Sequence, residues 1–155
     1  MMVSRFGVTK EVEIDYGHRI QTHGSQCSQL HGHRGRIVVT ISGPLQTIGF
    51  STGMVLDFSD IKDILMDLHA KWDHALLLDI SDPFLKAVDA QWKFDLADVG
   101  LAKVVRLDRA PTAENLAALA FAFIQVELDE KYLDNIKLVS VTFYETPTSS
   151  ATVKA

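Results

Sequence analysis

Cysteine, long apolar runs and excess positive charge are all scarce in this chain of 155 residues. Its single cysteine, Cys27, allows no disulfide within the chain, which suits a reducing cytoplasm. No apolar run reaches the roughly 18 residues that would span a bilayer, and the first residues lack the apolar block of a signal peptide. With 15 basic against 20 acidic residues, the net charge of -5 disfavours nonspecific binding to nucleic acid or an anionic membrane. We therefore expect a cytoplasmic protein without nucleic-acid or membrane partners.

The remaining composition is ordinary for a globular protein. Hydrophobic residues make up 47% and charged residues 23% of the chain, enough for a core and a solvated surface. Neither an internal repeat nor a low-complexity segment divides it. The length therefore suits one domain over residues 1–155.

Three segments alternate between apolar and polar residues, which predicts half-buried β-strands. They run from Phe6 to Tyr16, from about His33 to Ser42, and over residues 135–146. In the third strand, we expect Val139, Val141 and Phe143 on the apolar face. The last residues, TSSATVKA, read as either a final strand or a tail.

Two segments have helical spacing. In residues 57–72 apolar residues recur every three or four positions, with Ser59 as the expected N-cap. Residues 111–130 open with Pro111 and Thr112 and are apolar nearly all round, which predicts a buried helix. The order of elements predicts an α+β fold with two helices on one face of an antiparallel sheet. Between the helices, the segment from about Asp79 to Arg109 is hard to assign; it suggests a short helix after Pro83 and a short strand near Val104.

Three histidines share the apolar faces of the first two strands. His31 and His33 have the parity of Ile37, and His18 continues the parity of Tyr16. If the strands form a hairpin, three imidazoles converge where their connecting loop begins and ends. Three neutral imidazoles with a fourth position left open describe a catalytic zinc site. The alternative is that each is a hydrogen-bonded core histidine.

Cys27 precedes His31 and His33 in the stretch CSQLHGH and has three possible roles. It could close a structural metal site, act as a nucleophile or base beside an open one, or simply be a small buried residue. The candidate partner in proton transfer is the pair Asp73 and His74 in KWDHALL, just past the first helix. The alternative for this pair is a solvated loop.

Glu145 ends the apolar face of the last alternating strand. A carboxylate at such a place is unfavourable unless it is paired. It is therefore either paired with a partner or a solvated residue at a strand end.

These stretches occur in a recognisable order: a histidine, then C-x-x-L-H-G-H, G-M-V-L-D-F-S-D-I-K, W-D-H, P-T-A-E-N-L-A and Y-E-T-P-T. Together they resemble the 6-pyruvoyl-tetrahydropterin synthase and 6-carboxy-tetrahydropterin synthase family. The combination is highly specific, although each piece alone is not. The segment at about 79–109 is longer than in compact members of the family, and the resemblance says nothing about it.

The resemblance implies the tunnelling fold, in which antiparallel strands and two helices per subunit assemble through barrels into trimers and usually hexamers. Active sites would lie between subunits, with one zinc ion per subunit. The implied zinc ligands are His18, His31 and His33.

The resemblance also implies the residues that act on the substrate. Cys27 matches the catalytic cysteine, and Asp73 and His74 match the pair of the proton relay. Glu145 matches the glutamate that anchors the pterin ring, and Thr112 matches a hydroxyl of the pterin pocket. Arg34 and Arg36 are candidate partners for the substrate's phosphates, although Arg34 stands where the family more often has a smaller polar residue.

The implied reaction acts on 7,8-dihydroneopterin triphosphate. The short CSQLHGH spacing favours the lyase that makes 6-carboxy-5,6,7,8-tetrahydropterin, acetaldehyde and triphosphate for queuosine and other 7-deazapurines. The alternative within the family is the 6-pyruvoyl synthase, which eliminates triphosphate; a hydroxymethyl branch tends to have glutamate where Cys27 stands. Outside the family, the alternative is a noncatalytic zinc-binding oligomer in which Cys27 completes the metal shell.

Overall fold

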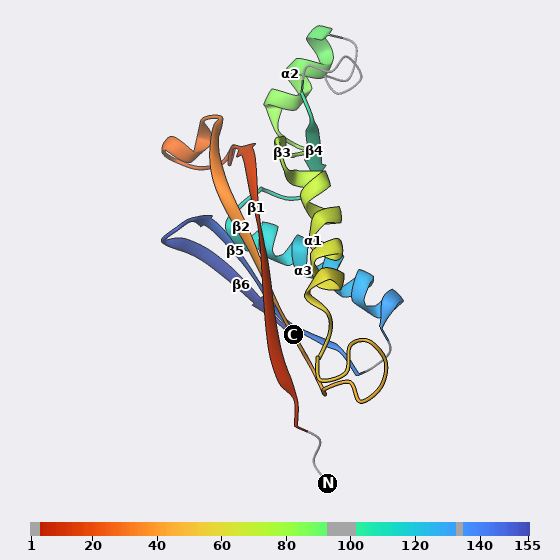
Figure 1. The fold of residues 1–155 in the computed structure, drawn as a ribbon. Helices are drawn as coiled ribbons and strands as arrows, with labels where there is room; N and C mark the ends of the chain where they lie inside the picture. The colour runs from red at the N-terminus through yellow and green to blue at the C-terminus, as the bar shows by residue number, and fades with distance from the viewer. Residues whose placement is uncertain (1–3, 93–101, 133–134) are drawn as a thin grey trace.

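A computed structural model describes residues 4–92, 102–132 and 135–155, and shows a curved six-stranded sheet with helices on one side (Figure 1). The strands are β1 (Phe6–His18), β2 (His31–Gly43), β3 (Ala75–Asp79), β4 (Val104–Leu107), β5 (Lys137–Thr146) and β6 (Ser149–Lys154). The helices are α1 (Phe58–Trp72), α2 (Pro83–Trp92) and α3 (Ala113–Lys131), with a short 3-10 turn at Gln26–Ser28. The three strands and two helices predicted from spacing are therefore confirmed, and the C-terminal residues form a strand.

The sheet has the order β4-β3-β1-β2-β5-β6. Its β1, β2, β5 and β6 pair antiparallel as expected, but β3 and β4 add a parallel edge beside the end of β1. The prediction of a purely antiparallel sheet was therefore incomplete. It missed β3 because the sequence ALLLD does not alternate, as is common for a short strand that is covered on both faces.

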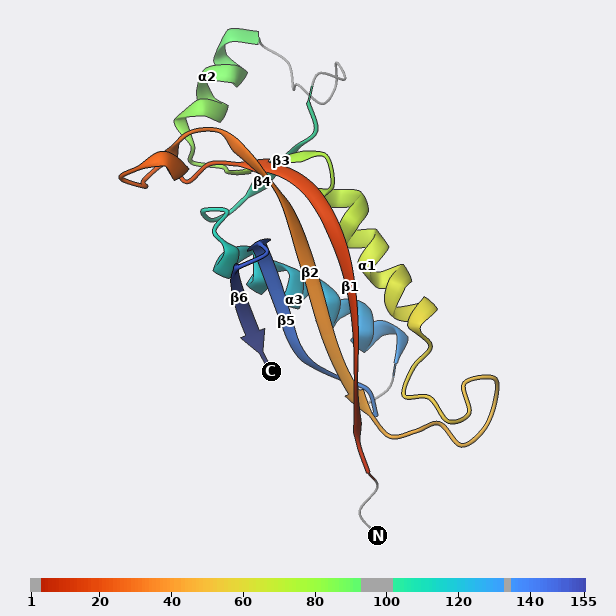
Figure 2. The same ribbon diagram turned by 60° about the vertical axis from the view of Figure 1, so that its left-hand side comes forward.

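Helices α1 and α3 cover one face of the sheet, as predicted (Figures 1 and 2). The cap of α1 differs from the expected one: Asp57 accepts hydrogen bonds from the backbone N–H and the hydroxyl of Ser59. Thr112 caps α3 by accepting the N–H of Asn115. Helix α3 has one buried stripe, but Val126 on another side is 55% exposed, so the helix is not buried all round.

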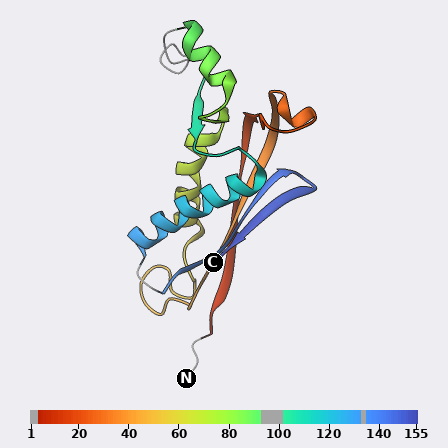
Figure 3. The same ribbon diagram turned by 180° about the vertical axis from the view of Figure 1, so that it is seen from behind.

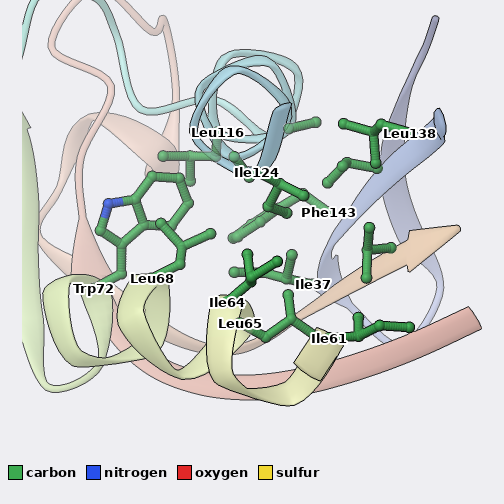
Figure 4. Close-up of a cluster of buried hydrophobic side chains, with 14 of the residues drawn as sticks. Ile37, Ile61, Ile64, Leu65, Leu68, Trp72, Leu116, Ile124, Leu138 and Phe143 are labelled. Carbon is green, nitrogen blue, oxygen red and sulfur yellow. The ribbon is translucent and has the colours of Figure 1, made fainter. Parts of the chain in front are cut away.

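The core fills the space between these helices and the sheet (Figure 4). Its fully buried large side chains include Ile61, Leu65 and Leu68 of α1, Leu116 and Ile124 of α3, and Ile37 and Phe143 of the sheet. Gly35 of β2 makes room for two aromatic rings, because a Cβ there would lie 2.9 Å from the ring of Tyr16 and 3.2 Å from that of Phe143. The Tyr16 ring in turn lies against the imidazoles of His18 and His33, with ring centroids 5.1 Å and 5.9 Å apart.

One predicted core residue is outside the core. A bulge in the β2–β5 pairing pairs Thr40 with Ser140 but Ile41 with Leu138, so Val139 is the extra residue. Its side chain is 39% exposed, and Leu138 takes the buried position. Val141 and Phe143 lie beyond the bulge and are buried as predicted.

The segment at about 79–109 contains the predicted short helix, α2, and the predicted short strand, β4. Residues 93–101 of this segment lie outside the described part of the chain. Helix α2 extends past the end of the sheet (Figures 1 and 3), and buried Asp82 joins its N-terminal end to Arg19, with 3.3 Å between Oδ2 and Nε. Within the described ranges, no helix is both long and apolar enough to cross a membrane.

The bulge predicts unequal effects of the same substitution at Val141 and Val139. Val141→Ala should lower the free energy of unfolding by about 1.5–2.5 kcal/mol, because it removes two fully buried methyl groups and leaves a cavity. Val139→Ala should change it by less than about 0.5 kcal/mol, because the side chain faces solvent. Urea denaturation of the two variants measures both values, and equal losses would contradict the bulge.

Candidate metal centre and active site

The three histidines converge at the end of the β1–β2 hairpin. The hairpin register places His18, the last residue of β1, directly opposite His31, the first residue of β2. His33 follows two residues later and therefore points to the same face. One ring nitrogen from each of the three lies within 4.8 Å of the others, so the group could hold a metal ion. Convergence, which the sequence predicted only conditionally, is confirmed.

Hydrogen bonds fix which nitrogen of two rings is available. His18 Nδ1 lies 2.8 Å from the carbonyl oxygen of Pro111, and His31 Nδ1 lies 2.7 Å from that of Gln29. A carbonyl can only accept, so both Nδ1 atoms carry the proton in the neutral rings, and both Nε2 atoms present lone pairs.

Those two Nε2 atoms face each other at 3.1 Å. Two lone pairs repel at this distance, whereas a tetrahedral ion that bound both at about 2.0–2.1 Å would hold them about 3.4 Å apart. The arrangement therefore suits a shared cation, and the carbonyls supply the outer hydrogen bonds that orient metal-binding imidazoles.

Burial favours the neutral form of two of the three imidazoles, those of His18 and His33. Removal from solvent lowers the pKa of His18, which is fully buried, although the hydrogen bond to Pro111 opposes this. Removal from solvent also lowers the pKa of His33, against the opposing charge of Glu145. Because protons compete with a metal for the same lone pairs, a lowered pKa favours metal binding at neutral pH.

Glu145 and Cys27 border the same cavity as His31 and His33. Glu145 Oε1 lies 3.5 Å from His18 Nε2 and 3.9 Å from His33 Nε2, so its carboxylate faces the cluster as its parity predicted. Cys27 lies in the 3-10 turn and lines a cavity of about 420 Å³ together with Gln26, Gln29, His31, His33 and Glu145. Cys27 is not one of the three groups whose ligand atoms converge.

Asp73 and His74 form a pair in contact with α1 and β1. The Asp73 carboxylate accepts the backbone N–H of Asp15 at 2.8 Å through Oδ1 and the Nδ1–H of His74 at 2.7 Å through Oδ2. Partial burial raises the pKa of Asp73, but these hydrogen bonds and the nearby His69 and His74 outweigh it, so the pKa is lowered. The carboxylate therefore stays ionised and orients the imidazole.

His74 and Cys27 line different cavities. His74 borders a cavity of about 770 Å³ with Arg34, His31 and His33, so two of the three histidines line both this cavity and that of Cys27. Among the described residues, His74 does not border the cavity of Cys27, and Cys27 does not border this one. One chain therefore does not bring the predicted thiol and base into one cavity.

The other two predicted substrate residues are engaged elsewhere. Arg34 forms a two-point ion pair with Asp15, with Nε 3.0 Å from Oδ1. The hydroxyl of Thr112 caps α3, next to the Pro111 carbonyl that holds His18. Their predicted contacts with substrate stay predictions.

Several positioning groups escaped the sequence analysis. The carbonyls of Pro111 and Gln29 orient two imidazoles, and backbone groups leave no signal in residue type. Lys103 donates to the carbonyls of Ala70 and Asp73 at the end of α1. It lies in the segment that showed no regular spacing, so no signal could have found it.

The architecture defines a class before any comparison of sequences. Its strand order, its covering helices and its histidine cluster belong to an α+β protein of the tunnelling fold with a candidate metal centre. The structure superposes on a 6-pyruvoyl tetrahydropterin synthase of Plasmodium vivax with a TM-score of 0.73 over 98% of both chains, at 18% identity. An uncharacterized protein from Wolinella succinogenes gives 0.80 over 97% of this chain and 98% of its own, at 23% identity.

Sequence comparison gives the family. Residues 7–155 match the family described as 6-pyruvoyl tetrahydropterin synthase. The chain is 34% identical to a probable 6-carboxy-5,6,7,8-tetrahydropterin synthase of Halobacterium salinarum, over 94% of this chain and 84% of that one. It is 31% identical to the 6-carboxy-5,6,7,8-tetrahydropterin synthase of Haemophilus influenzae, over 93% and 95% of the two chains. The chain belongs to the 6-pyruvoyl tetrahydropterin synthase family, and is thus a lyase-type enzyme as predicted.

The geometry predicts how metal binding responds to loss of one ligand. His31→Ala should weaken metal binding by more than the roughly 10- to 100-fold that loss of an outer partner costs, because it removes a direct ligand. His23→Ala is the matched control, since His23 is exposed in the loop that joins β1 to β2. Metal content after dialysis against a weak chelator measures both. Equal metal retention by the two variants would exclude His31 as a ligand.

Proposed function

We propose that the protein is a zinc-dependent enzyme that converts 7,8-dihydroneopterin triphosphate to 6-carboxy-5,6,7,8-tetrahydropterin, with release of acetaldehyde and triphosphate. This step would serve queuosine and other 7-deazapurine biosynthesis in the cytoplasm. The observation that carries the proposal is the convergence of three imidazole nitrogens beside a cavity lined by a thiol and a carboxylate. The names of the curated relatives support the choice of product.

Zinc would be held by His18, His31 and His33, one ion per subunit. The donor set of three neutral nitrogens suits zinc, and the adjoining cavity offers room for substrate at a fourth position. When bound, the ion supplies a Lewis acid that lowers the pKa of the hydroxyl groups on the substrate's side chain.

Glu145 would hold the pterin ring. A pterin presents an amino group and a ring N–H side by side, and one carboxylate can accept both. The carboxylate of Glu145 lies 3.5 Å from the nearest imidazole nitrogen, so a ring that it held would extend into the cavity beside the metal ligands. Thr112 would complete the pterin pocket from the N-terminus of α3.

Cys27 would remove a proton from the substrate's side chain. Its place in the cavity of His31, His33 and Glu145 puts the thiol beside the point where that side chain would lie. The same observation counts against the noncatalytic alternative, because a cysteine that closed the metal shell would have its sulfur among the converging ligand atoms.

Asp73 and His74 would complete the relay from another subunit. The separate cavities of His74 and Cys27 within one chain support this arrangement. It agrees with the expected homohexamer, a dimer of trimers with active sites between subunits. Each subunit would be a single domain, which the family match over residues 7–155 supports.

The triphosphate would lie near Arg34 and Arg36. Both border a cavity of about 440 Å³ that also reaches Tyr144 and Glu145. The Arg36 guanidinium lies 4.4 Å from the centre of the Tyr144 ring, and its Nη1 lies 3.4 Å from Glu11 Oε2, so Arg36 would share its charge with that carboxylate. Arg34 would have to share its charge with Asp15.

The first test is product identification by mass spectrometry after incubation of the zinc-loaded protein with 7,8-dihydroneopterin triphosphate. We expect 6-carboxy-5,6,7,8-tetrahydropterin and acetaldehyde, and no product from Cys27→Ala with its zinc retained. A pyruvoyl product would assign the protein to the 6-pyruvoyl synthase branch instead. No turnover, with zinc bound and pterin unbound, would favour the noncatalytic oligomer.

A second test addresses the shared active site. Cys27→Ala and His74→Ala should each be nearly inactive, whereas oligomers that contain both variants should regain about a quarter of their sites by random assembly. Co-expression with two affinity tags and sequential purification isolates the mixed oligomers, and the activity per zinc measures the recovery. Mixed oligomers as inactive as their parents would place both residues in the site of one subunit.

A further inference from the structure

The backbone of His74 has an unfavourable conformation. Its φ of 52° lies in the left-handed region, where a side chain crowds the following carbonyl, and no other described non-glycine residue has a positive φ. Such conformations persist only where the surroundings hold them, and they are frequent at functional sites. The groups that hold this residue are therefore part of how the site is built.

Hydrogen bonds hold both ends of the peptide group between Asp73 and His74. Its N–H donates to the carbonyl of Asp15 in β1 at 2.7 Å. Its carbonyl accepts from the Lys103 ammonium at 2.9 Å. Rotation of this peptide group would relieve the φ of His74, and each of the two bonds opposes that rotation.

Lys103 is held in place by hydrogen bonds of both its side chain and its backbone. Its ammonium also donates to the carbonyl of Ala70, in the last turn of α1, where unpaired carbonyls and the helix dipole favour a cation. Its backbone carbonyl accepts the N–H of Leu76 at 2.8 Å, just before β4 pairs with β3. The residue is thus fixed at its backbone by the sheet and at its side chain by the helix end.

The held peptide group determines where the imidazole lies. Side chains of adjacent residues can hydrogen-bond only in some backbone geometries, and here Asp73 Oδ2 accepts from His74 Nδ1 at 2.7 Å. That bond leaves Nε2 available on a side chain that is 78% exposed and borders the 770 Å³ cavity. With a rotated peptide group, the Asp73–His74 bond and the direction of Nε2 would both change.

We propose that Lys103 is a positioning residue, which fixes the left-handed conformation of His74 and so aims its imidazole for proton transfer. This inference rests on the role proposed for His74 above. It also assigns a role to Lys103 within the segment at about 79–109, whose role the sequence left open. Lys103 borders the same cavity as His74, and in the proposed role it acts through His74.

Three variants test the proposal in the zinc-loaded full-length protein. Lys103→Met keeps the length of the side chain but removes both hydrogen bonds, and should lower kcat roughly 10- to 100-fold, as expected for a misplaced catalytic group, with KM changed less than about threefold. Lys103→Arg should recover most of the loss, because it restores a donor. Arg106→Met is the matched control, since Arg106 is a nearby cation in β4 whose ion pair is with Asp89; its kcat should stay near wild type.

A double-mutant cycle separates positioning from general damage. In the His74→Ala background, Lys103→Met should lower kcat by less than about twofold, because the residue through which it acts is gone. A similar loss in both backgrounds would overturn the proposal, and so would wild-type kcat in Lys103→Met.

A measurement without turnover keeps this inference separate from the proposed function. Hydrogen exchange of the His74 amide, followed by NMR or by fragment-resolved mass spectrometry, should accelerate at least about tenfold in Lys103→Met and stay unchanged in Arg106→Met. If the wild type lacked turnover, the proposed function would fail, while this acceleration would still support the positioning of His74. Unchanged exchange in Lys103→Met would show that Asp15 alone holds the peptide group, and would overturn the inference.

Discussion

The pairing of β1 with β2 is the constraint on which the site depends. Its register brings His18 opposite His31, and the pleat adds His33 on the same face. Two lone pairs then face each other at 3.1 Å, a contact that a cation would relieve. The hydrogen bonds that place the proton on Nδ1 of both rings come from the carbonyls of Pro111 and Gln29, so the hairpin alone does not determine the tautomers.

The helices connect the core to this site. Helix α3 packs on the sheet through a buried stripe, and its capped start places the Pro111 carbonyl against the buried ring of His18. Helix α1 ends at Trp72 in the core, so the next two residues, Asp73 and His74, emerge where β1 can bind them. The packing that stabilises the fold therefore also fixes the positions of His18, Asp73 and His74 in the candidate site.

The parallel edge of the sheet has a different relation to the site. Strand β3 lies beside the last residues of β1 and β4 lies beside β3, and the segment between β3 and β4 contains α2, which extends beyond the sheet. Asp82 of this segment contacts Arg19, the residue after His18, while Lys103 binds the end of α1. The least regular part of the sequence thus contacts the elements that carry both the histidines and the Asp73–His74 pair.

Alternation and helical spacing in the sequence determined the five long strands and helices, β1, β2, β5, α1 and α3, because burial on one face imposes a period on the order of apolar residues. They also placed His18, His31, His33 and Glu145 on inward faces. The bulge at Val139 and the parallel strand β3 depended on pairing with distant residues, which a local period cannot register. The cap at Asp57 is local, but Asp57 and Ser59 are both good capping residues, so residue type alone did not distinguish them. Only the tertiary structure decided that His74 and Cys27 line separate cavities, because that depends on how elements far apart in the chain pack together. It also decided that Lys103 binds the Asp73–His74 peptide group, because that contact is made through a backbone carbonyl, which is the same in every residue.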